Sequence, residues 1–251
     1  MQITVIIPAL DEEAAIGLVV KEVPRDLVGE VLVVDNGSTD GTAEVARAAG
    51  ARVIHEPVRG YGAACLAGAM AARDANILVF LDGDRSDDPS EMPSVLRPIL
   101  DGDADLVVGA RIPAMAEDGA LTSHQRFGNR LVTGMVRLLY GLPLSDFGPF
   151  RAIRADVLRD LGMENKTYGW PVEMIVKAAK KGYRVVNVPV SCRRRIGRSK
   201  VAGTLKGSLL AGYHLLFTTL RYAFLGGGLR PPSDSSPRDC AGKARVRTKR
   251  S

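Results

Sequence analysis

Two aspartates separated by a single glycine offer the most specific chemistry in the sequence. Asp82 and Asp84 follow the apolar run VFL, so both carboxylates leave the end of a buried strand, and Gly83 permits a tight turn. Carboxylate oxygens suit Mg²⁺ or Mn²⁺, which take their remaining ligands from water and substrate phosphates. The spacing therefore predicts a metal that bridges to a diphosphate. The alternative is an acidic turn with a purely structural role.

Carboxylates also follow the first two expected strands. Asp35 ends the apolar run EVLVV and can accept hydrogen bonds from a base or ribose, whereas the residues after it form a turn and a helix start. The segment from Pro8 onwards combines a helix-start signal with the acidic side chains of Asp11 and Glu13. We expect these residues to lie at the same edge of the sheet as Asp82.

Cations near glycines or in a run are candidate phosphate ligands. Arg59 precedes Gly60 and Gly62 at a helix start, where small residues can bring the main chain close to a phosphate or sugar, although close packing explains the glycines equally well. Residues 193–200 include five cations and no acid. A solvated face and a phosphate clamp both fit this run.

The elements that must hold these residues alternate between short apolar runs and helical patterns. Continuously apolar strands are buried on both faces, which predicts an α/β domain with a mostly parallel, Rossmann-like central sheet flanked by helices. Ligands of such sheets bind at the carboxyl ends of the strands. The expected strands are residues 3–8, 30–35, 51–56, 76–82, 105–111 and 183–190, and the expected helices are residues 11–23, 42–49, 61–73, 89–100 and 125–140.

The basic charge of the chain comes from its last residues. The 251-residue sequence has a formal net charge of +6, and residues 229–251 hold seven basic and two acidic side chains. The remainder has 27 basic and 26 acidic residues, so no basic face is expected on the folded part and nucleic-acid binding is disfavoured. Residues 229–251 are expected to be disordered, either solvated or attracted to anionic lipid headgroups.

Residues 205–228 form the most apolar window. His214, Arg221 and several small residues interrupt it, so a membrane-spanning helix is not expected. Its aromatic and cationic side chains suit a helix at a membrane surface, and packing against the domain is the alternative. We therefore expect one domain, residues 1–204, followed by this apolar helix, residues 205–228, and the basic tail, residues 229–251.

Two features concern the compartment. Three scattered cysteines lack the spacing of a disulfide framework or a zinc site, which favours a reducing environment. The residues after Met1 lack the charged, apolar and small-residue regions of a secretory signal. We expect a cytoplasmic protein, with peripheral contact to the inner face of the cell membrane as an option.

Taken together, the motifs resemble those of family 2 glycosyltransferases with the GT-A fold, specifically compact bacterial relatives of dolichyl-phosphate mannosyl- and glucosyltransferases. The matching segments cover about residues 1–205 in order and spacing. They are VIIPALDEE, EVLVVDNGSTDGT, RGYGAA, LVFLDGDRSDDP, DFGPFRAIR, YGWPVEM and VPV followed by RRIGRSK. One departure is Arg85, which stands where an uncharged residue is common.

The resemblance implies roles for individual residues in binding the donor and the acceptor. The nucleotide pocket is assigned to Pro8, Asp11, Glu13 and Asp35, the metal and donor diphosphate to Asp82 and Asp84, the vicinity of the donor sugar to Arg111, and the diphosphate or acceptor phosphate to Arg195, Ser199 and Lys200. Glu173 stands where many members of the family place an acceptor-side carboxylate.

The resemblance also implies an inverting transfer of a hexose from a UDP- or GDP-linked sugar to a polyprenyl phosphate or a cell-envelope glycan precursor. The metal at Asp82 and Asp84 would neutralise the departing diphosphate with help from Arg195. A hydroxyl acceptor needs a base, for which Glu173 is the candidate, whereas a phosphate acceptor is already an anion. The alternatives are a sugar nucleotidyltransferase with a similar metal site, and a non-catalytic module that binds membranes or nucleic acids through the basic residues.

Overall fold

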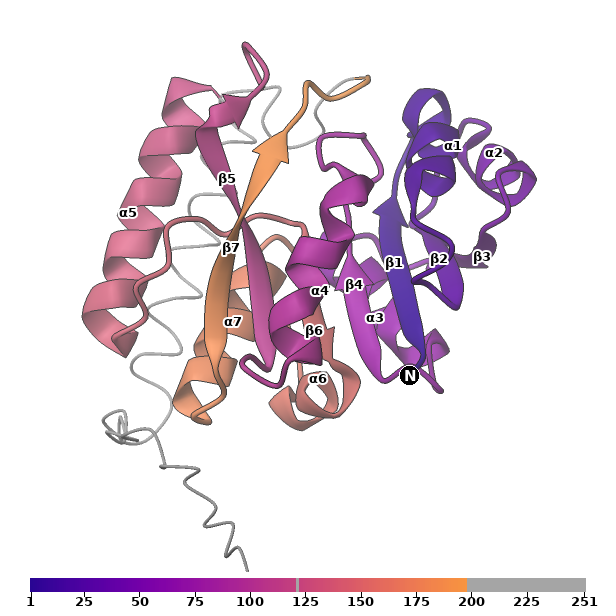
Figure 1. Cartoon of the computed structure of the whole chain (residues 1–251). Helices are drawn as coiled ribbons and strands as arrows, with labels where there is room; N and C mark the ends of the chain where they lie inside the picture. The colour runs from indigo at the N-terminus through magenta and orange to yellow at the C-terminus, as the bar shows by residue number, and fades with distance from the viewer. Residues whose placement is uncertain (121, 198–251) are drawn as a thin grey trace, which may run out of the picture.

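A seven-stranded sheet forms the centre of the part of the protein that the computed structural model describes, residues 1–120 and 122–197 (Figure 1). The strands are β1 (Ile3–Ala9), β2 (Glu30–Asp35), β3 (Arg52–His55), β4 (Ile77–Phe80), β5 (Leu106–Ala116), β6 (Arg151–Arg154) and β7 (Val185–Cys192). The helices are α1 (Glu13–Glu22), α2 (Thr42–Ala48), α3 (Tyr61–Ala71), α4 (Met92–Leu100), α5 (Ser123–Tyr140), α6 (Ala155–Leu161) and α7 (Trp170–Lys180), with a 3₁₀ turn, Pro89–Glu91, before α4.

Most neighbouring strands are parallel, as the sequence predicts. β1 pairs in parallel with β2 and β4, β2 with β3, and β5 with β7. β6 runs antiparallel between β4 and β5 and is absent from the expected strands. Its sequence, RAIR, has two arginines in four residues and so lacks the continuous apolar pattern of a core strand. Arg151 is nevertheless buried, which is rare for an arginine.

The strand order places a topological switch point beside β1. The order is β3-β2-β1-β4-β6-β5-β7, so the chain moves outwards from β1 through β2 to β3 and then returns to the other side of β1 with β4. Ligands of open α/β sheets bind where the order reverses, outside the carboxyl ends of the strands. The residues that follow β1 and β4 therefore stand where a ligand is expected.

Two apolar layers cover the two faces of the sheet. Residues of α1, α2 and α4 pack on one face, and residues of α3, α5, α6 and α7 pack on the other. In the second layer the rings of Phe80 and Trp170 meet edge to face with their centroids 4.9 Å apart. Because both faces are covered, the strands are apolar at consecutive positions.

The expected helices are present, with small shifts at their ends. α1 begins at Glu13 instead of residue 11, because Asp11 has a left-handed main chain with φ 50°. Residues 198–251 lie outside the described part, and with them the expected apolar helix at 205–228, the basic tail, Ser199 and Lys200. No helix within residues 1–197, residue 121 aside, has both the length and the apolar character needed to cross a bilayer.

Candidate active site

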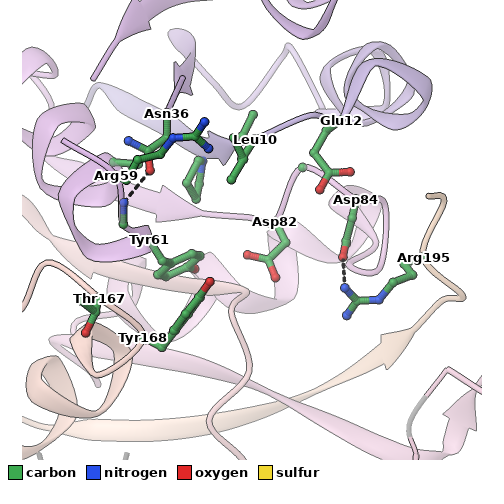
Figure 2. A pocket seen from close by; sticks show the side chains of 15 residues that line it. Leu10, Glu12, Asn36, Arg59, Tyr61, Asp82, Asp84, Thr167, Tyr168 and Arg195 are labelled. Atoms are coloured by element: carbon green, nitrogen blue, oxygen red, sulfur yellow. Dashed lines mark hydrogen bonds and ion pairs between the residues drawn. The ribbon is translucent and has the colours of Figure 1, made fainter. Parts of the chain in front are cut away.

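A cavity of about 400 Å³ opens at the carboxyl ends of β1, β2 and β4 (Figure 2). It lies at the edge of the sheet where the strand order predicts a ligand. The residues that line it are Pro8, Ala9, Leu10, Glu12, Asn36, Arg59, Gly60, Tyr61, Ala64, Asp82, Gly83, Asp84, Thr167, Tyr168 and Arg195. The candidate metal ligands, two candidate phosphate ligands and Pro8 are thus brought together in one cavity.

Asp82 and Asp84 reach this cavity from the end of β4. Oδ1 of Asp84 accepts the main-chain N–H of Ser86 at 3.0 Å, and its Oδ2 lies 3.0 Å from Nη1 of Arg195. Burial, and then the charge of Asp84, raise the pKa of Asp82 to about 7, against the lowering effect of Arg195. Neighbouring carboxylates that repel one another in this way favour a cation beside them.

Two acids that follow the DGD turn stabilise the local main chain. Asp87 is buried, and its Oδ2 accepts the main-chain N–H of Asp82 at 3.1 Å. Burial and the charge of Asp82 raise the pKa of Asp87 well above its usual value. Asp88 caps the 3₁₀ turn, because its Oδ1 accepts the main-chain N–H of Ser90 at 3.0 Å. Asp87 and Asp88 therefore have structural roles beside the DGD turn.

The basic residues after β7 have separate roles. Arg193 forms ion pairs with Glu22 and Asp88 and so ties the end of β7 to α1 and to the turn after β4. Arg195 instead directs its guanidinium group to Asp84 inside the cavity (Figure 2). Within the basic run, Arg193 therefore has a structural role and Arg195 lines the cavity. The composition of the run alone does not distinguish these roles.

Asn36 shapes one end of the cavity. Its Nδ2 donates to the carbonyl oxygens of Glu56 and Val58 at 2.9 and 2.8 Å, and its Oδ1 accepts the main-chain N–H of Gly60 at 2.8 Å. These three bonds hold the loop that carries Arg59 at the cavity. An asparagine after a strand is typical of a turn, so the sequence gives no sign of this longer reach.

The glycines at the start of α3 allow another loop to approach. A Cβ on Gly60 would lie 2.1 Å from the carbonyl oxygen of Lys166, and a Cβ on Gly62 would lie 2.1 Å from that of Asn165. Both positions therefore require glycine for close packing, which was the alternative to a role in phosphate binding. The loop after α6 thereby reaches the cavity and adds Tyr168 to its wall.

Glu173, the expected acceptor-side base, lies behind that loop. Its side chain is 0% exposed, and its two oxygens accept the main-chain N–H groups of Glu164 and Asn165 at 2.9 and 2.8 Å. Nζ of Lys177 lies 2.8 Å from Oε1 of Glu173. This carboxylate is engaged and does not line the cavity, and the role of Glu173 as a base stays a prediction. Its geometry is that of an anchor for the loop that carries Tyr168.

Two acids assigned to the nucleotide pocket bind main chain instead. Oδ1 of Asp11 accepts the N–H of Thr39 at 2.7 Å, and Oε2 of Glu13 accepts the N–H of Gly41 at 3.1 Å. These bonds join the segment after β1 to the segment after β2. Asp11 and Glu13 do not line this cavity, whereas the carboxylate between them, Glu12, does, and their assignment to the nucleotide pocket stays a prediction.

Asp35 also lies outside the cavity wall, whereas Pro8 lines it. Oδ1 of Asp35 accepts the main-chain N–H of Ser38 at 3.0 Å, and its Oδ2 lies 3.1 Å from Nδ1 of His55. Burial raises the pKa of Asp35, but the hydrogen bonds of Ser38 and His55 outweigh it, so this pKa is lowered. Asp35 is therefore a charged anchor for the turn after β2.

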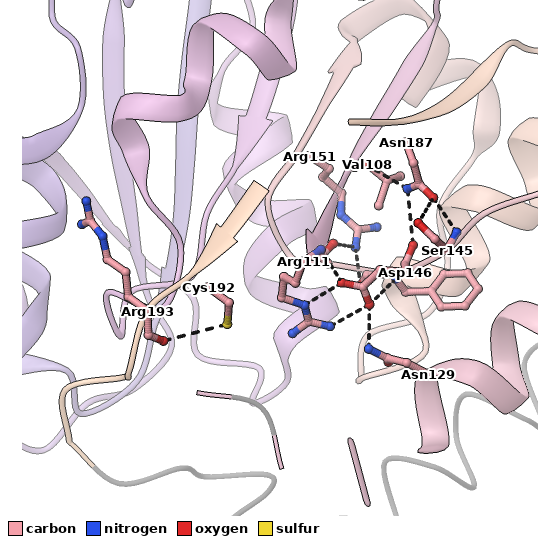
Figure 3. A network of polar contacts seen from close by, with 11 residues as sticks. Val108, Arg111, Asn129, Ser145, Asp146, Arg151, Asn187, Cys192 and Arg193 are labelled. Atoms are coloured by element: carbon pink, nitrogen blue, oxygen red, sulfur yellow. Dashed lines mark hydrogen bonds and ion pairs between the residues drawn. The ribbon is translucent and has the colours of Figure 1, made fainter. Parts of the chain in front are cut away.

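Arg111, expected near the donor sugar, lies in the middle of β5 and belongs to a polar network around the buried Asp146 (Figure 3). Its Nε and Nη2 donate to the Asp146 carboxylate at 2.7 and 2.9 Å, and Nδ2 of Asn129, from α5, donates to the same group at 2.6 Å. Burial lowers the pKa of Arg111, but Asp146 outweighs burial and raises it. Arg111 does not line the cavity, yet its charge lowers the pKa of Asp82.

Arg151 is a candidate functional residue that the sequence does not reveal. Its side chain is buried and donates to the carbonyl oxygens of Phe147, Gly148 and Pro171 at 3.4, 2.5 and 3.1 Å. Burial lowers the pKa of Arg151, while nearby negative groups, Asp82 among them, raise it. The buried guanidinium group of Arg151 thus helps to balance the negative charge of Asp82 and Asp87.

The sequence matches the profile of Glycosyl transferase family 2 over residues 4–162. The chain belongs to this family. The matched residues include the ends of β1, β2 and β4, which build the cavity, and they stop before Arg195. The protein is therefore a family 2 glycosyltransferase, as the resemblance of its motifs implies.

Relatives in family 2 extend the match beyond that profile. An uncharacterized glycosyltransferase of Mycobacterium tuberculosis is 40% identical over 210 residues, which cover 83% of this chain and 94% of that protein. A dolichyl-phosphate hexose transferase of Haloferax volcanii is 35% identical over 202 residues, which cover 79% of this chain and 86% of that protein. The expected likeness to dolichyl-phosphate sugar transferases is confirmed.

A solved structure shows the same likeness in the fold. It is glucosyl-3-phosphoglycerate synthase from Mycobacterium tuberculosis in complex with Mn²⁺, uridine-diphosphate-glucose and phosphoglyceric acid. The two proteins superpose with a TM-score of 0.73 at 25% identity, covering 88% of this chain and 79% of the other. The GT-A fold expected for this family 2 protein is confirmed by the likeness and by the mostly parallel sheet.

The cavity of this family 2 glycosyltransferase fits a divalent metal that is bound partly by the protein and partly by the phosphates of a substrate. Among the described residues, no three His, Cys, Asp or Glu side chains gather into a site that would hold a metal alone. Asp82 and Asp84 present two carboxylates to one cavity. Mg²⁺ in proteins typically takes one or two carboxylates and completes its ligands with water and phosphate. The raised pKa of Asp82, caused by burial and then by Asp84, indicates a repulsion that a cation would relieve.

Proposed function

We propose that this protein transfers a hexose from a UDP- or GDP-linked sugar to a lipid phosphate, with inversion at the anomeric carbon and with Mg²⁺ or Mn²⁺ held by Asp82 and Asp84. The observation that carries the proposal is one cavity that combines these carboxylates with the cations Arg59 and Arg195. A metal-bound diphosphate needs both kinds of group, since the carboxylates hold the metal and the arginines bind the remaining phosphate charge.

The two ends of the cavity match the two halves of a nucleotide sugar. Arg59 lies at one end beside Asn36, Asp84 and Arg195 lie at the other, and Tyr61 lies between them (Figure 2). We place the nucleoside near Arg59 and Tyr61, because a guanidinium group and an aromatic ring can both stack on a base. The diphosphate then extends toward Asp84.

The leaving group is a nucleoside diphosphate, whose negative charge grows as the sugar departs. A bound divalent ion would supply Lewis-acid stabilisation of that charge. Arg195, 3.0 Å from Asp84, stands where it can neutralise the same charge. The main-chain N–H of Ser86 fixes the orientation of Asp84, so the site is arranged before the donor arrives.

A phosphate acceptor accounts for the position of Glu173. Such an acceptor is already an anion, so no side chain has to remove a proton from it. Glu173 is buried with both oxygens engaged, which supports an acceptor of this class over a sugar hydroxyl. The name of the Haloferax relative, a dolichyl-phosphate hexose transferase, supports the same class. A lipid acceptor would bring the protein to the inner face of the cell membrane.

Identification of the released nucleotide tests the proposal. The purified protein is incubated with Mg²⁺ or Mn²⁺ and a panel of UDP- and GDP-hexoses, with and without a polyprenyl phosphate in detergent. We expect release of nucleoside diphosphate that requires both the metal and the lipid phosphate. Asp82→Asn and Asp84→Asn should each lower the rate by about 10²-fold or more. Asp101→Asn, whose side chain is 54% exposed at the end of α4, should not change the rate.

Two outcomes would overturn the proposal. Release of pyrophosphate from a nucleoside triphosphate and a hexose 1-phosphate, supplied in place of the nucleotide sugar, would identify a sugar nucleotidyltransferase, which makes the donor and does not consume it. Transfer to the hydroxyl of a glycan precursor, with no product on the lipid phosphate, would overturn the acceptor class and leave the donor site standing.

A further inference from the structure

The outer face of α5 carries apolar side chains where a surface helix normally carries polar ones. Phe127, Leu131 and Leu138 are 71%, 45% and 84% exposed. Together with Gly134 they follow helical spacing, so they form one stripe along the helix. α5 lies at one side of the molecule (Figure 1), where it packs against α7. An exposed apolar stripe of this kind marks a surface that contacts something else.

The opposite face of α5 already packs against the domain. Val132 and Val136 are buried in the apolar layer that covers this face of the sheet. The helix is therefore apolar on two sides, and packing of the domain explains one of them.

A row of arginines flanks the stripe. Arg126, Arg130 and Arg137 are exposed, and helical spacing places all three along the same side of the stripe. The sequence of α5, SHQRFGNRLVTGMVRLLY, contains no Asp or Glu. The face is thus apolar along its middle and positive along its flank. Helices that lie in the interface of an anionic membrane have this combination.

Charge distinguishes a bilayer from the protein surfaces that could cover the stripe. A second copy that docked through its own α5 would bring more arginines and no acid to the contact. The apolar window at residues 205–228 contains Lys206, His214 and Arg221 and no acid, so it offers the α5 arginines no counter-charge. An anionic bilayer supplies acyl chains for the stripe and phosphates for the arginines.

Hydrogen bonds connect α5 with Arg111, whose charge acts on the active site. Asn129 donates to the Asp146 carboxylate at 2.6 Å, and this carboxylate also holds Arg111 through bonds of 2.7 and 2.9 Å (Figure 3). Arg111 in turn lies within electrostatic reach of Asp82. The outer surface of α5 therefore belongs to the helix that, through Asp146, holds the charge of Arg111 near Asp82.

We propose that the outer face of α5 docks this protein on an anionic lipid bilayer. Phe127, Leu131 and Leu138 enter the boundary between headgroups and acyl chains, and the flanking arginines bind lipid phosphates. The purpose of the docking rests on the proposed function, because it would bring a membrane-embedded acceptor phosphate to the side of Arg111. The docking itself is a binding event that is measured without catalysis.

Vesicle sedimentation with the full-length protein tests the docking. The probes are vesicles of phosphatidylcholine alone and of phosphatidylcholine mixed with phosphatidylglycerol. The stripe variant carries Phe127→Ser, Leu131→Ser and Leu138→Ser, the arginine variant carries Arg126→Gln, Arg130→Gln and Arg137→Gln, and the matched control carries Leu18→Ser, Met70→Ser and Leu100→Ser, which are exposed apolar positions on other helices.

The wild type and the control should bind the anionic vesicles equally and bind phosphatidylcholine much less. The stripe variant should bind the anionic vesicles at least about tenfold more weakly, since it lacks the three apolar side chains that would enter the bilayer. The arginine variant should lose about fivefold per arginine. In addition, the ratio of transfer rates with vesicle-embedded and with detergent-dispersed polyprenyl phosphate should fall in the stripe variant.

Three results would overturn the docking. The first is a wild-type protein that binds neither kind of vesicle. The second is a stripe variant that binds like the wild type while neutralisation of the tail cations Arg245, Arg247 and Lys249 abolishes binding, which would assign the contact to the tail. The third is a stripe variant that changes from dimer to monomer in light scattering with unaltered vesicle binding, which would assign the stripe to a second copy. Stripe-dependent binding in a protein without transferase activity would support the docking and overturn only the proposed function.

Discussion

Arg195 approaches Asp84 to 3.0 Å, so an arginine from the segment after β7 already faces one oxygen of the second aspartate in the DGD turn. The main-chain N–H of Ile196 donates to the carbonyl oxygen of Asp84 at 2.9 Å, which fixes that segment to the turn. A divalent cation between Asp82 and Asp84 would therefore compete with the guanidinium group for the same carboxylate. Displaced from it, Arg195 would stand beside the donor diphosphate.

Arg195→Gln should separate metal binding from turnover. Mn²⁺ alone should bind the variant more tightly, because the competing guanidinium group is gone. The rate of transfer should nevertheless fall about 10²-fold, because the departing diphosphate loses a counter-charge. Calorimetric titration with Mn²⁺ and the nucleotide-release assay measure the two effects. Arg194→Gln is the matched control, since Arg194 is exposed and does not line the cavity, and weaker Mn²⁺ binding with unchanged turnover in Arg195→Gln would contradict this role.

Asp82→Asn should stabilise the metal-free protein at alkaline pH. Burial and the charge of Asp84 raise the pKa of Asp82 from 3.8 to about 7, so the folded protein binds this proton more tightly than the unfolded chain does. The stability that this proton contributes is therefore lost as the pH rises between these values. In EDTA at pH 8, the variant should melt about 3 °C or more above the wild type, and the gain should shrink toward pH 4. Thermal unfolding measures this, and an equal gain at both pH values would exclude the repulsion as its cause.

Glu173→Gln should reduce stability and leave the pH dependence of turnover unchanged. The variant amide can accept only one of the two main-chain N–H bonds and loses the ion pair with Lys177, so we expect a loss of about 2–4 kcal/mol in the free energy of unfolding. Urea unfolding and a pH–rate profile are the measurements. Glu164→Gln, with its side chain 69% exposed and 4.0 Å from Lys177, should change stability by less than about 0.5 kcal/mol. If one limb of the pH–rate profile disappeared in Glu173→Gln, Glu173 would have to be assigned as the base after all.

The parallel part of the sheet could be predicted because its strands are buried on both faces and are continuously apolar. β6 could not, since it contains the buried Arg151. The bonds that make this burial tolerable come from the carbonyl oxygens of Gly148 and Pro171, and the second of these lies twenty residues away in the sequence. No local pattern contains such a contact, so a four-residue strand with two arginines does not resemble a core element.

The site shows the same division between local and tertiary information. The positions of Asp82 and Asp84 at the cavity follow from a local rule, because the residue after a buried parallel strand stands at the ligand-binding edge. The position of Glu173 depends on how the loop after α6 folds against α3, and this in turn depends on the missing side chains of Gly60 and Gly62. The spacing of these glycines indicates that another group approaches the start of α3, but it does not identify that group as the loop after α6.

Asp105→Asn should lower stability at neutral pH and leave transfer unaffected, because Asp105 lies at the edge of the sheet opposite the cavity, just before β5. Its carboxylate accepts the main-chain N–H of Arg184 at 2.9 Å and lies 3.1 and 3.4 Å from the guanidinium groups of Arg184 and Arg154. Burial raises the pKa of Asp105, but the bonds and charges of the two arginines outweigh burial and lower it below 3.8.

This lowered pKa fixes the sign of the pH dependence. The contribution of Asp105 to stability is fully present above its unfolded pKa and is lost as the pH falls through its folded pKa. Asp105→Asn should therefore cost about 1–3 kcal/mol at pH 7, and the difference from the wild type should shrink as the pH falls below 3.8. Urea unfolding across this range measures the difference. Asp103→Asn, at a nearby exposed residue, is the control, and its free energy of unfolding should stay close to that of the wild type. If the stability deficit of Asp105→Asn persisted unchanged in acid, packing and not charge would be responsible.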